Sequence, residues 1–225
     1  LDEGKSTILT DEKIKKIKKL SGTSWDVIGQ GMMLRSSRPL VVFEGKTDVM
    51  YVKRAFEMLK SRSDDYATLN VDFLNANGAG NVKSFIDNLK SFVPDSKKII
   101  IFFDRDNAGK DGARAVTGIS KDDERVAHYQ DIVQDNITTS FIPYKDGVTE
   151  GDFLIEDYFS WDDTIKAIVE DVIPDRKHPI KMLPNLPEKI KKELEKRINR
   201  FTSDEFRGFI PLLDKIVELT KVHTT

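Results

Sequence analysis

Two short, wholly apolar runs stand out in the first half of the sequence. Residues 39–43 (Pro-Leu-Val-Val-Phe) and 98–103 (Lys-Ile-Ile-Ile-Phe-Phe, apolar after its first residue) have the composition of strands that are buried on both faces of a parallel sheet. Residues 69–74 alternate as a further strand, and residues 138–142 are expected to form a fourth. These runs predict one sheet of four strands.

Apolar residues recur at helical spacing between the strands. This spacing predicts a helix over residues 47–60, with Val52, Phe56 and Leu59 on one face. A second helix is expected after the glycine-containing turn at 75–80. Because strands alternate with helices, the expected fold class is α/β, with a parallel central sheet flanked by helices.

The pattern becomes helical after Gly151. Helices are predicted to begin within 153–159, to continue or follow at 164–172, and to run over 188–200 and 211–221, with a proline-containing loop at 174–187.

The pattern also suggests how the chain is organised. We expect a polar lead-in over residues 1–37, a main domain over 38–150 and a small helical C-terminal extension over 151–225. In the lead-in, Thr10 is placed to cap a short helix with a lysine-rich, solvated face. The chain begins at Leu1 rather than Met, as expected for a piece of a longer protein.

Composition narrows the classes of function. Charged residues make up 33% of the 225 residues, but the formal net charge is only −2, so nucleic-acid binding would need a local basic patch. The absence of cysteine excludes disulfides, zinc ribbons and thiol catalysis. No apolar run approaches the roughly 20 residues that cross a bilayer, and a secretory signal is absent. We expect a soluble, cytoplasmic protein with no membrane partner.

Four acidic residues are placed where the strands end. Glu44 directly follows the first strand, Asp104 directly follows the third, and Asp106 projects to the same side two residues later. Asp48 lies in the first turn of the next helix and faces the same edge. Because ligands of parallel sheets collect at the carboxyl ends of the strands, these carboxylates predict a site for Mg²⁺ or Mn²⁺.

Simpler explanations exist for single members of this set. Taken alone, Asp48 or Asp106 would be interpreted as a helix-capping acid. A calcium-binding EF-hand loop starting at Asp104 is excluded, since Ala108 and Ala115 occupy positions that need oxygen ligands. The combination of positions therefore carries the prediction.

Two of these segments resemble the motifs of the TOPRIM domain family. Residues 41–48, Val-Val-Phe-Glu-Gly-Lys-Thr-Asp, look like its first motif, a hydrophobic strand that ends in Glu-Gly. Residues 102–109, Phe-Phe-Asp-Arg-Asp-Asn-Ala-Gly, look like its Asp-x-Asp motif. The turn at 77–81 is similar to a glycine turn of the family. The resemblance covers about residues 38–145 and implies a Rossmann-like TOPRIM fold.

The resemblance also implies roles for individual residues. Asp104 and Asp106 would ligate Mg²⁺ (or Mn²⁺), and Glu44 would ligate the same ion or act as general acid or base. Expected substrate contacts are Gly45, Lys46, Gly78, Gly80 and Arg105.

Residues 153–159 narrow the resemblance further. They are similar to a helix start found in the overcoming-lysogenization-defect (OLD) nucleases, which would assign Glu156, with Asp48, to a second metal. The alternative is that Glu156 and Asp157 are first-turn acids favoured by the helix dipole. These nucleases also hold the scissile phosphate with a lysine. Lys181 is the candidate catalytic residue, with Lys191 and Lys192 as further candidates.

The sequence therefore predicts a Mg²⁺- or Mn²⁺-dependent endonuclease. The expected partner is nucleic acid, DNA ahead of RNA, with an ATPase domain or subunit and a homodimer also expected from the resemblance. Tyrosine-based strand transfer is not expected, because the five tyrosines are better explained as packing or surface residues. Two alternatives stay open: a TOPRIM enzyme that acts on RNA or resembles a primase, and a non-catalytic nucleic-acid-binding module.

Overall fold

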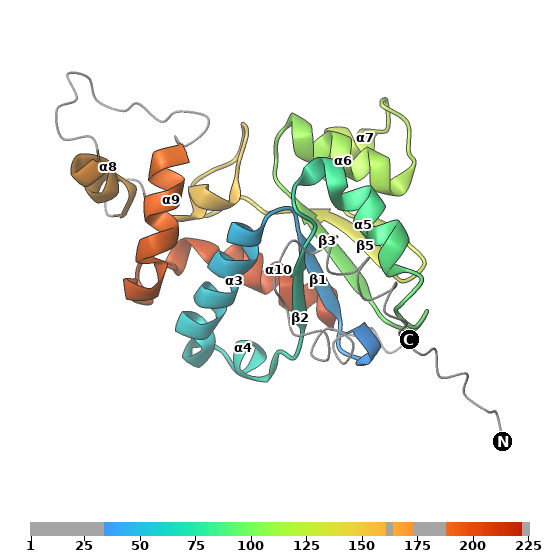
Figure 1. The fold of residues 1–225 in the computed structure, drawn as a ribbon, viewed down its shortest axis with the longest axis horizontal. Coiled ribbons are helices and arrows are strands. Elements are labelled where there is room, and N and C mark those ends of the chain that lie inside the picture. Colours follow the sequence, from blue (N-terminus) through green and yellow to red (C-terminus); the bar gives the residue numbers. More distant parts are fainter. Residues whose placement is uncertain (1–33, 161–163, 173–187, 222–225) are drawn as a thin grey trace, which may run out of the picture.

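The computed structural model describes residues 34–160, 164–172 and 188–221. Its centre is a five-stranded sheet with the order β2-β1-β3-β5-β4 (Figure 1). The strands are β1 (Leu40–Phe43), β2 (Asp72–Asn75), β3 (Ile99–Phe103), β4 (Ile132–Gln134) and β5 (Ile137–Phe141). All neighbours are parallel except β4, which is antiparallel to β5.

Helices cover both faces of this sheet (Figure 1). The α-helices are α3 (Lys46–Leu59), α4 (Asp64–Thr68), α5 (Val82–Leu89), α6 (Asn107–Thr117), α7 (Glu124–Ala127), α8 (Lys166–Val172), α9 (Glu188–Arg197) and α10 (Ile210–Thr220). Short 3₁₀ turns are η1 (Lys60–Arg62), η2 (Ala79–Asn81), η3 (Ile155–Tyr158), η5 (Ile198–Arg200) and η6 (Arg207–Phe209). The predicted α/β class, with C-terminal helices added, is confirmed.

The alternation of side chains along β1 divides the apolar core into two halves. Val41 and Phe43 point to the face covered by α3, α9 and α10, where Phe43 stacks on Phe102 with ring centroids 5.4 Å apart. Leu40 and Val42 point to the face covered by α5, α6 and α7. Because both halves are buried, the strand is apolar at every position. The C-terminal helices are thus packed on the same core as the sheet.

The strand predicted at 69–74 is shorter and later in the structure. Residue Leu69 ends the helix α4, which was not predicted, and its N–H donates to the carbonyl of Tyr66. The strand β2 begins only at Asp72, whose carboxylate is buried. The first three residues of the predicted strand, 69–71, therefore follow α4 and lie outside the sheet.

Three elements between β3 and β5, namely α6, α7 and β4, were missed by the sequence prediction. The helix α6 contains Gly109 and Gly112, which lower helix propensity and hide its apolar face. Both glycines are needed, because a Cβ at Gly109 would lie 2.1 Å from the Asp104 carbonyl oxygen and a Cβ at Gly112 would lie 2.4 Å from the Phe103 ring. The edge strand β4 has only three residues, too few to show an alternating pattern, and two of them are exposed.

The prediction that an α-helix begins within 153–159 was also wrong. Only the single turn η3 forms there, and Phe153 instead pairs with Arg105 in an isolated antiparallel bridge. The two backbone hydrogen bonds of this bridge are 2.9 and 3.0 Å long. The bridge keeps residue 153 extended, and it ties the chain after β5 to the segment after β3.

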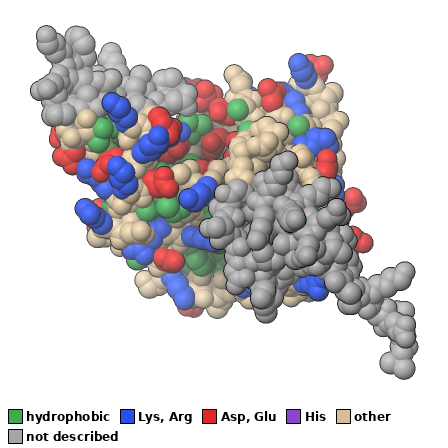
Figure 2. Space-filling model, viewed as in Figure 1, with side chains coloured by type: hydrophobic (Ala, Val, Ile, Leu, Met, Phe, Trp, Pro, Cys, Tyr) green, Lys and Arg blue, Asp and Glu red, His purple; other side chains and the backbone are tan. Residues whose placement is uncertain are grey.

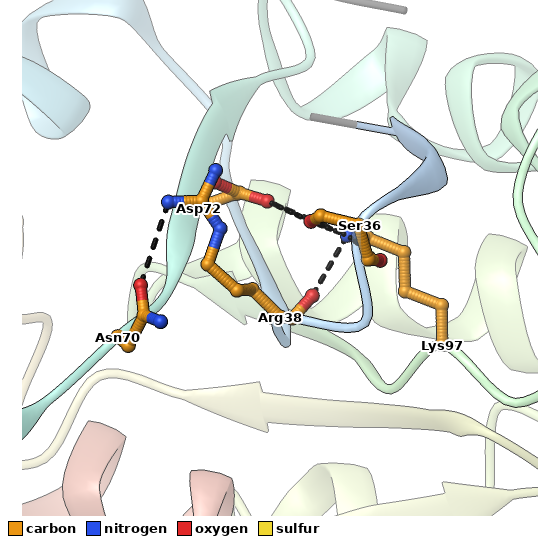
Figure 3. A network of polar contacts seen from close by, with 5 residues as sticks. All are labelled: Ser36, Arg38, Asn70, Asp72 and Lys97. Atoms are coloured by element: carbon orange, nitrogen blue, oxygen red, sulfur yellow. Dashed lines mark hydrogen bonds and ion pairs between the residues drawn. The ribbon is translucent and has the colours of Figure 1, made fainter. Parts of the chain in front are cut away.

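A buried polar network closes the amino edge of the sheet (Figure 3). The Lys97 ammonium, on a residue only 1% exposed, donates to the carbonyl of Arg38 (2.7 Å) and approaches Asp72 (3.4 Å). Ser36 also donates to Asp72, and Arg38 pairs with it at 2.8 Å. The network gives the buried Lys97 ammonium hydrogen-bond partners and an opposite charge, and it fixes the chain just before β1.

Several expectations lie outside the described residues. These are the lead-in helix capped by Thr10, the loop at 174–187 and Lys181. Within the described ranges, no helix combines the length and the apolar composition that a bilayer crossing requires.

Candidate active site

Two acidic residues meet at the carboxyl edge of the sheet. Glu44 follows β1 and Asp104 follows β3, and these strands are parallel neighbours, so both chains emerge at the same edge. The backbone N–H of Asp104 donates to Oε1 of Glu44 at 3.0 Å. The predicted convergence of the two strand ends is therefore present as a direct contact.

Asp48 joins them from the first turn of α3. Its Oδ2 accepts a hydrogen bond of 2.7 Å from the N–H of Gly45, and the residue is only 8% exposed. A Cβ at Gly45 would lie 3.1 Å from both carboxylate oxygens of Asp48. The glycine therefore gives the carboxylate room to turn back over the start of its own helix.

Asp106 is held by the helix that it caps. Its Oδ1 accepts a hydrogen bond of 2.7 Å from the N–H of Gly109 at the start of α6. A Cβ at Gly109 would lie 2.1 Å from the carbonyl oxygen of Asp104, so only glycine fits this close approach. The helix-capping role that Asp106 would be given on its own is therefore present, alongside its place at the strand end.

Glu156 reaches the same place from the C-terminal segment. The bridge between Arg105 and Phe153 brings η3 beside the end of β3, and Glu156 is 6% exposed there. Its Oε1 lies 2.9 Å from Nζ of Lys191 on α9. The sequence placed Lys191 among three candidates, and the structure brings it to the site.

Glu44, Asp48, Asp104, Asp106 and Glu156 form what we call the carboxylate cluster. Burial raises the pKa of Asp104 well above its usual value, and repulsion from the other four members raises it further. The face shown in Figure 2 mixes acidic and basic side chains, and acidic ones gather in its upper middle, between the regions of α9 and α6.

Two further members of the cluster have pKa values close to neutral. Burial raises the pKa of Glu44 to about 7, in spite of the hydrogen bond from Asp104 that lowers it. Burial also raises the pKa of Asp48 to about 6, and repulsion from Glu156 adds to the effect. Burial alone would lower the pKa of Lys191, but Glu156 raises it above its usual value. A cation in this cluster is thus electrostatically favoured.

The cluster offers the hard oxygen ligands that Mg²⁺ and Mn²⁺ prefer. As the side chains stand, however, no three acidic or histidine residues of the described ranges are arranged to hold one ion together. Internal contacts explain this, because Glu44, Asp48 and Asp106 each accept a backbone N–H and Glu156 pairs with Lys191. The ligand chemistry therefore fits a divalent ion, and its binding would exchange some of these contacts.

Other residues predicted to touch substrate lie around the cluster in different ways. Gly78 has φ +106°, and its N–H donates to the backbone carbonyl of Glu44 at 2.7 Å. Lys46 and Gly80 are exposed. Lys192, the alternative to Lys191, faces solvent and pairs with Glu188 on the same helix. The turn at Gly78 thus supports Glu44, while the contacts with substrate stay predictions.

Two buried polar atoms beside the cluster gave no signal in the sequence. Tyr51 lies one helical turn after Asp48 and is fully buried, yet its hydroxyl has no hydrogen-bond partner among the described residues. Oδ1 of Asn75, at the end of β2, is in the same situation. Unpaired buried polar atoms are rare, and here they flank the strand ends that carry the acidic residues.

Comparison with known families identifies the core of the chain. Residues 41–135 match the family described as Toprim-like, and the chain therefore contains a Toprim-like domain. The match includes Glu44, Asp48, Asp104 and Asp106 and ends before Glu156. Toprim domains act on nucleotidyl or phosphodiester groups, are typically catalytic and generally bind a divalent metal. Neither the curated proteins nor the solved structures gave a match to the chain.

Proposed function

We propose that this chain is a metal-dependent endonuclease that hydrolyses phosphodiester bonds in DNA, as the nuclease domain of an OLD-like protein. The observation that carries the proposal is the position of Glu156. A residue beyond the Toprim-like match joins the carboxylate cluster and brings Lys191 with it. Five carboxylates and one lysine are more than a single-ion site requires.

The residues divide naturally into two sets of ligands. Glu44, Asp104 and Asp106, at the ends of β1 and β3, would hold one ion. Asp48 and Glu156 would hold a second; burial raises the pKa of Asp48, and repulsion from the nearby Glu156 carboxylate adds to the effect. Bound divalent ions supply Lewis acidity and a water of lowered pKa.

The chain's own groups have definable tasks in such a reaction. With a pKa of about 7, Glu44 is able to take up or release a proton near neutral pH when it is not bound to an ion. Lys191, half-buried and positively charged, would hold a non-bridging oxygen of the scissile phosphate in place of its contact with Glu156. This assigns to Lys191 the task that the sequence gave to Lys181.

Hydrolysis is favoured over strand transfer by the surroundings of the tyrosines. Tyr51 and Tyr158 are buried, and Tyr66 donates to Asp214 far from the cluster. Tyr129 and Tyr144 pack against the Arg105 guanidinium. None of these positions suits a nucleophile for covalent catalysis. The preference for DNA and the expected ATPase partner rest on the resemblance of residues 153–159 alone.

The proposal is tested by incubating the chain with supercoiled plasmid and with RNA in the presence of Mg²⁺, Mn²⁺ or EDTA. We expect nicking of the plasmid with either metal, its loss in EDTA and its loss in Asp104→Asn. Asp87→Asn, on the exposed face of α5, is the matched control and should cleave as wild type. Cleavage of RNA alone would indicate a different Toprim enzyme, and no cleavage with any metal would indicate a non-catalytic module.

A further inference from the structure

Arg105 lies between the two aspartates of the cluster in sequence, but its side chain takes the opposite direction. In an extended segment, alternate side chains point to opposite sides, so Arg105 turns away from Asp104 and Asp106. Its backbone is fixed by the bridge to Phe153, and its Nε donates to the carbonyl of Ile142 at 2.6 Å. The guanidinium therefore lies past the end of β5, one strand away from the acidic residues.

Aromatic rings enclose this guanidinium. Its central carbon lies 4.4 Å from the ring centroid of Tyr144 and 4.8 Å from that of Tyr129, and Nζ of Lys110 lies 4.3 Å from the Tyr129 centroid. We call these four residues the arginine stack. Tyr144 packs edge-on against Phe153 and Tyr129 against Phe141, so both rings are held by the core. The guanidinium is thus oriented before any ligand arrives.

The terminal nitrogens of Arg105 are not used by the protein. In the described part of the chain, the only hydrogen bond of the Arg105 side chain is the one from Nε, and no acidic side chain forms an ion pair with the guanidinium. By contrast, Arg114 and Arg125 are paired with Asp111 and Asp123. A planar fork of donors without an acceptor is suited to bind phosphate.

We propose that the arginine stack binds a backbone phosphate of the nucleic-acid strand, adjacent to the phosphate that the carboxylate cluster hydrolyses. This inference rests on the proposed function and adds the path of the strand. Lys191 lies on the α9 side of the cluster and the arginine stack lies on the β5 side. Positive charges on both sides offset the repulsion between the acidic residues and a polyanion, so the strand crosses the cluster from α9 toward β5.

Direct binding tests this path without depending on cleavage. We would measure the dissociation constant of a fluorescein-labelled DNA oligonucleotide by anisotropy in EDTA over a series of KCl concentrations. Arg105→Gln should weaken binding about tenfold at low salt and reduce the slope of log K against log[KCl] by about one. Arg62→Gln, at the opposite edge of the sheet, removes the same charge and should bind with almost the wild-type affinity.

Arg105→Lys is the second variant, because it keeps the charge if Arg105→Gln fails to fold. It should retain the salt slope and still bind more weakly, since an ammonium cannot replace the planar fork. In cleavage assays both variants should raise KM and leave kcat within about twofold. Wild-type affinity and slope in both variants would overturn the inference while leaving the nuclease proposal intact. A wild-type chain that binds no nucleic acid would overturn both.

Discussion

Glu156 and Lys191 form an ion pair of 2.9 Å at the centre of the candidate site, although each belongs to a segment outside the Toprim-like match. Glu156 is held by the bridge at Phe153, and Lys191 lies on α9 with Ile190 and Leu194 anchored in the core. The C-terminal helices therefore supply charge to the site as well as packing to the sheet.

Substitution of Lys191 tests its assignment to the scissile phosphate. Lys191→Gln should lower the rate of cleavage by about a hundredfold, the effect of removing one charged donor from a developing oxyanion. Its free energy of unfolding should also fall, by about 3 kcal/mol, because the substitution leaves the buried Glu156 carboxylate without its cationic partner. Lys192→Gln, one residue along and solvent-facing, is the control, and equal activity of both variants would refute the assignment.

Glu156→Gln separates a ligand from a helix-capping acid. If Glu156 holds a metal, cleavage should fall at least tenfold and the metal concentration needed for half-maximal rate should rise. A first-turn acid contributes only about 0.3–1 kcal/mol to stability, so urea unfolding should change little. Glu188→Gln, at the exposed start of α9, should behave as wild type. A Glu156→Gln variant with cleavage within about twofold of wild type would remove Glu156 from the site.

The α/β class with its parallel sheet, and the position of four acidic residues at or beside the strand ends, could be predicted from the sequence, because apolar runs and strand ends are local features. The spatial order of the strands and the edge strand β4 were not predicted. Lys191 could not be chosen over Lys192, since the choice depends on which face of α9 packs on the core. The helix α6 itself was missed because Gly109 and Gly112 lower its helix propensity, and both are required by close contacts with Asp104 and Phe103.

Gly109 offers a test of how tightly the cluster is built. In Gly109→Ala the new methyl group would meet the Asp104 carbonyl, where a Cβ lies at 2.1 Å. Relief requires movement of the backbone that carries Asp104, so we expect a loss of stability of about 1–3 kcal/mol in thermal or urea unfolding. Gly80→Ala, where a Cβ meets nothing within 4 Å, is the control and should change stability by less than about 0.5 kcal/mol. Equal stability of the two variants would contradict the packing described here.

The raised pKa of Glu44 predicts how stability depends on pH. Its pKa is about 7 in the folded chain against 4.5 for the free side chain, so the folded state binds more protons between these values. Stability in EDTA should therefore fall as pH rises from about 4.5 through 7, by roughly 3 kcal/mol for this group. Glu44→Gln should flatten the profile in urea titrations at pH 5 and pH 8. An unchanged profile in the variant would show that Glu44 is not the titrating group.

Binding of Mn²⁺ by isothermal titration calorimetry at pH 7.5 tests the carboxylate cluster most directly, because it requires neither a substrate nor a partner. Wild type should bind Mn²⁺, and Asp104→Ala combined with Asp106→Ala should abolish the ion held at the ends of β1 and β3. Asp64→Ala combined with Asp65→Ala, on the exposed surface of α4, should bind as wild type. Equal binding by wild type and by the Asp104 and Asp106 double variant would contradict a metal centre at this edge of the sheet.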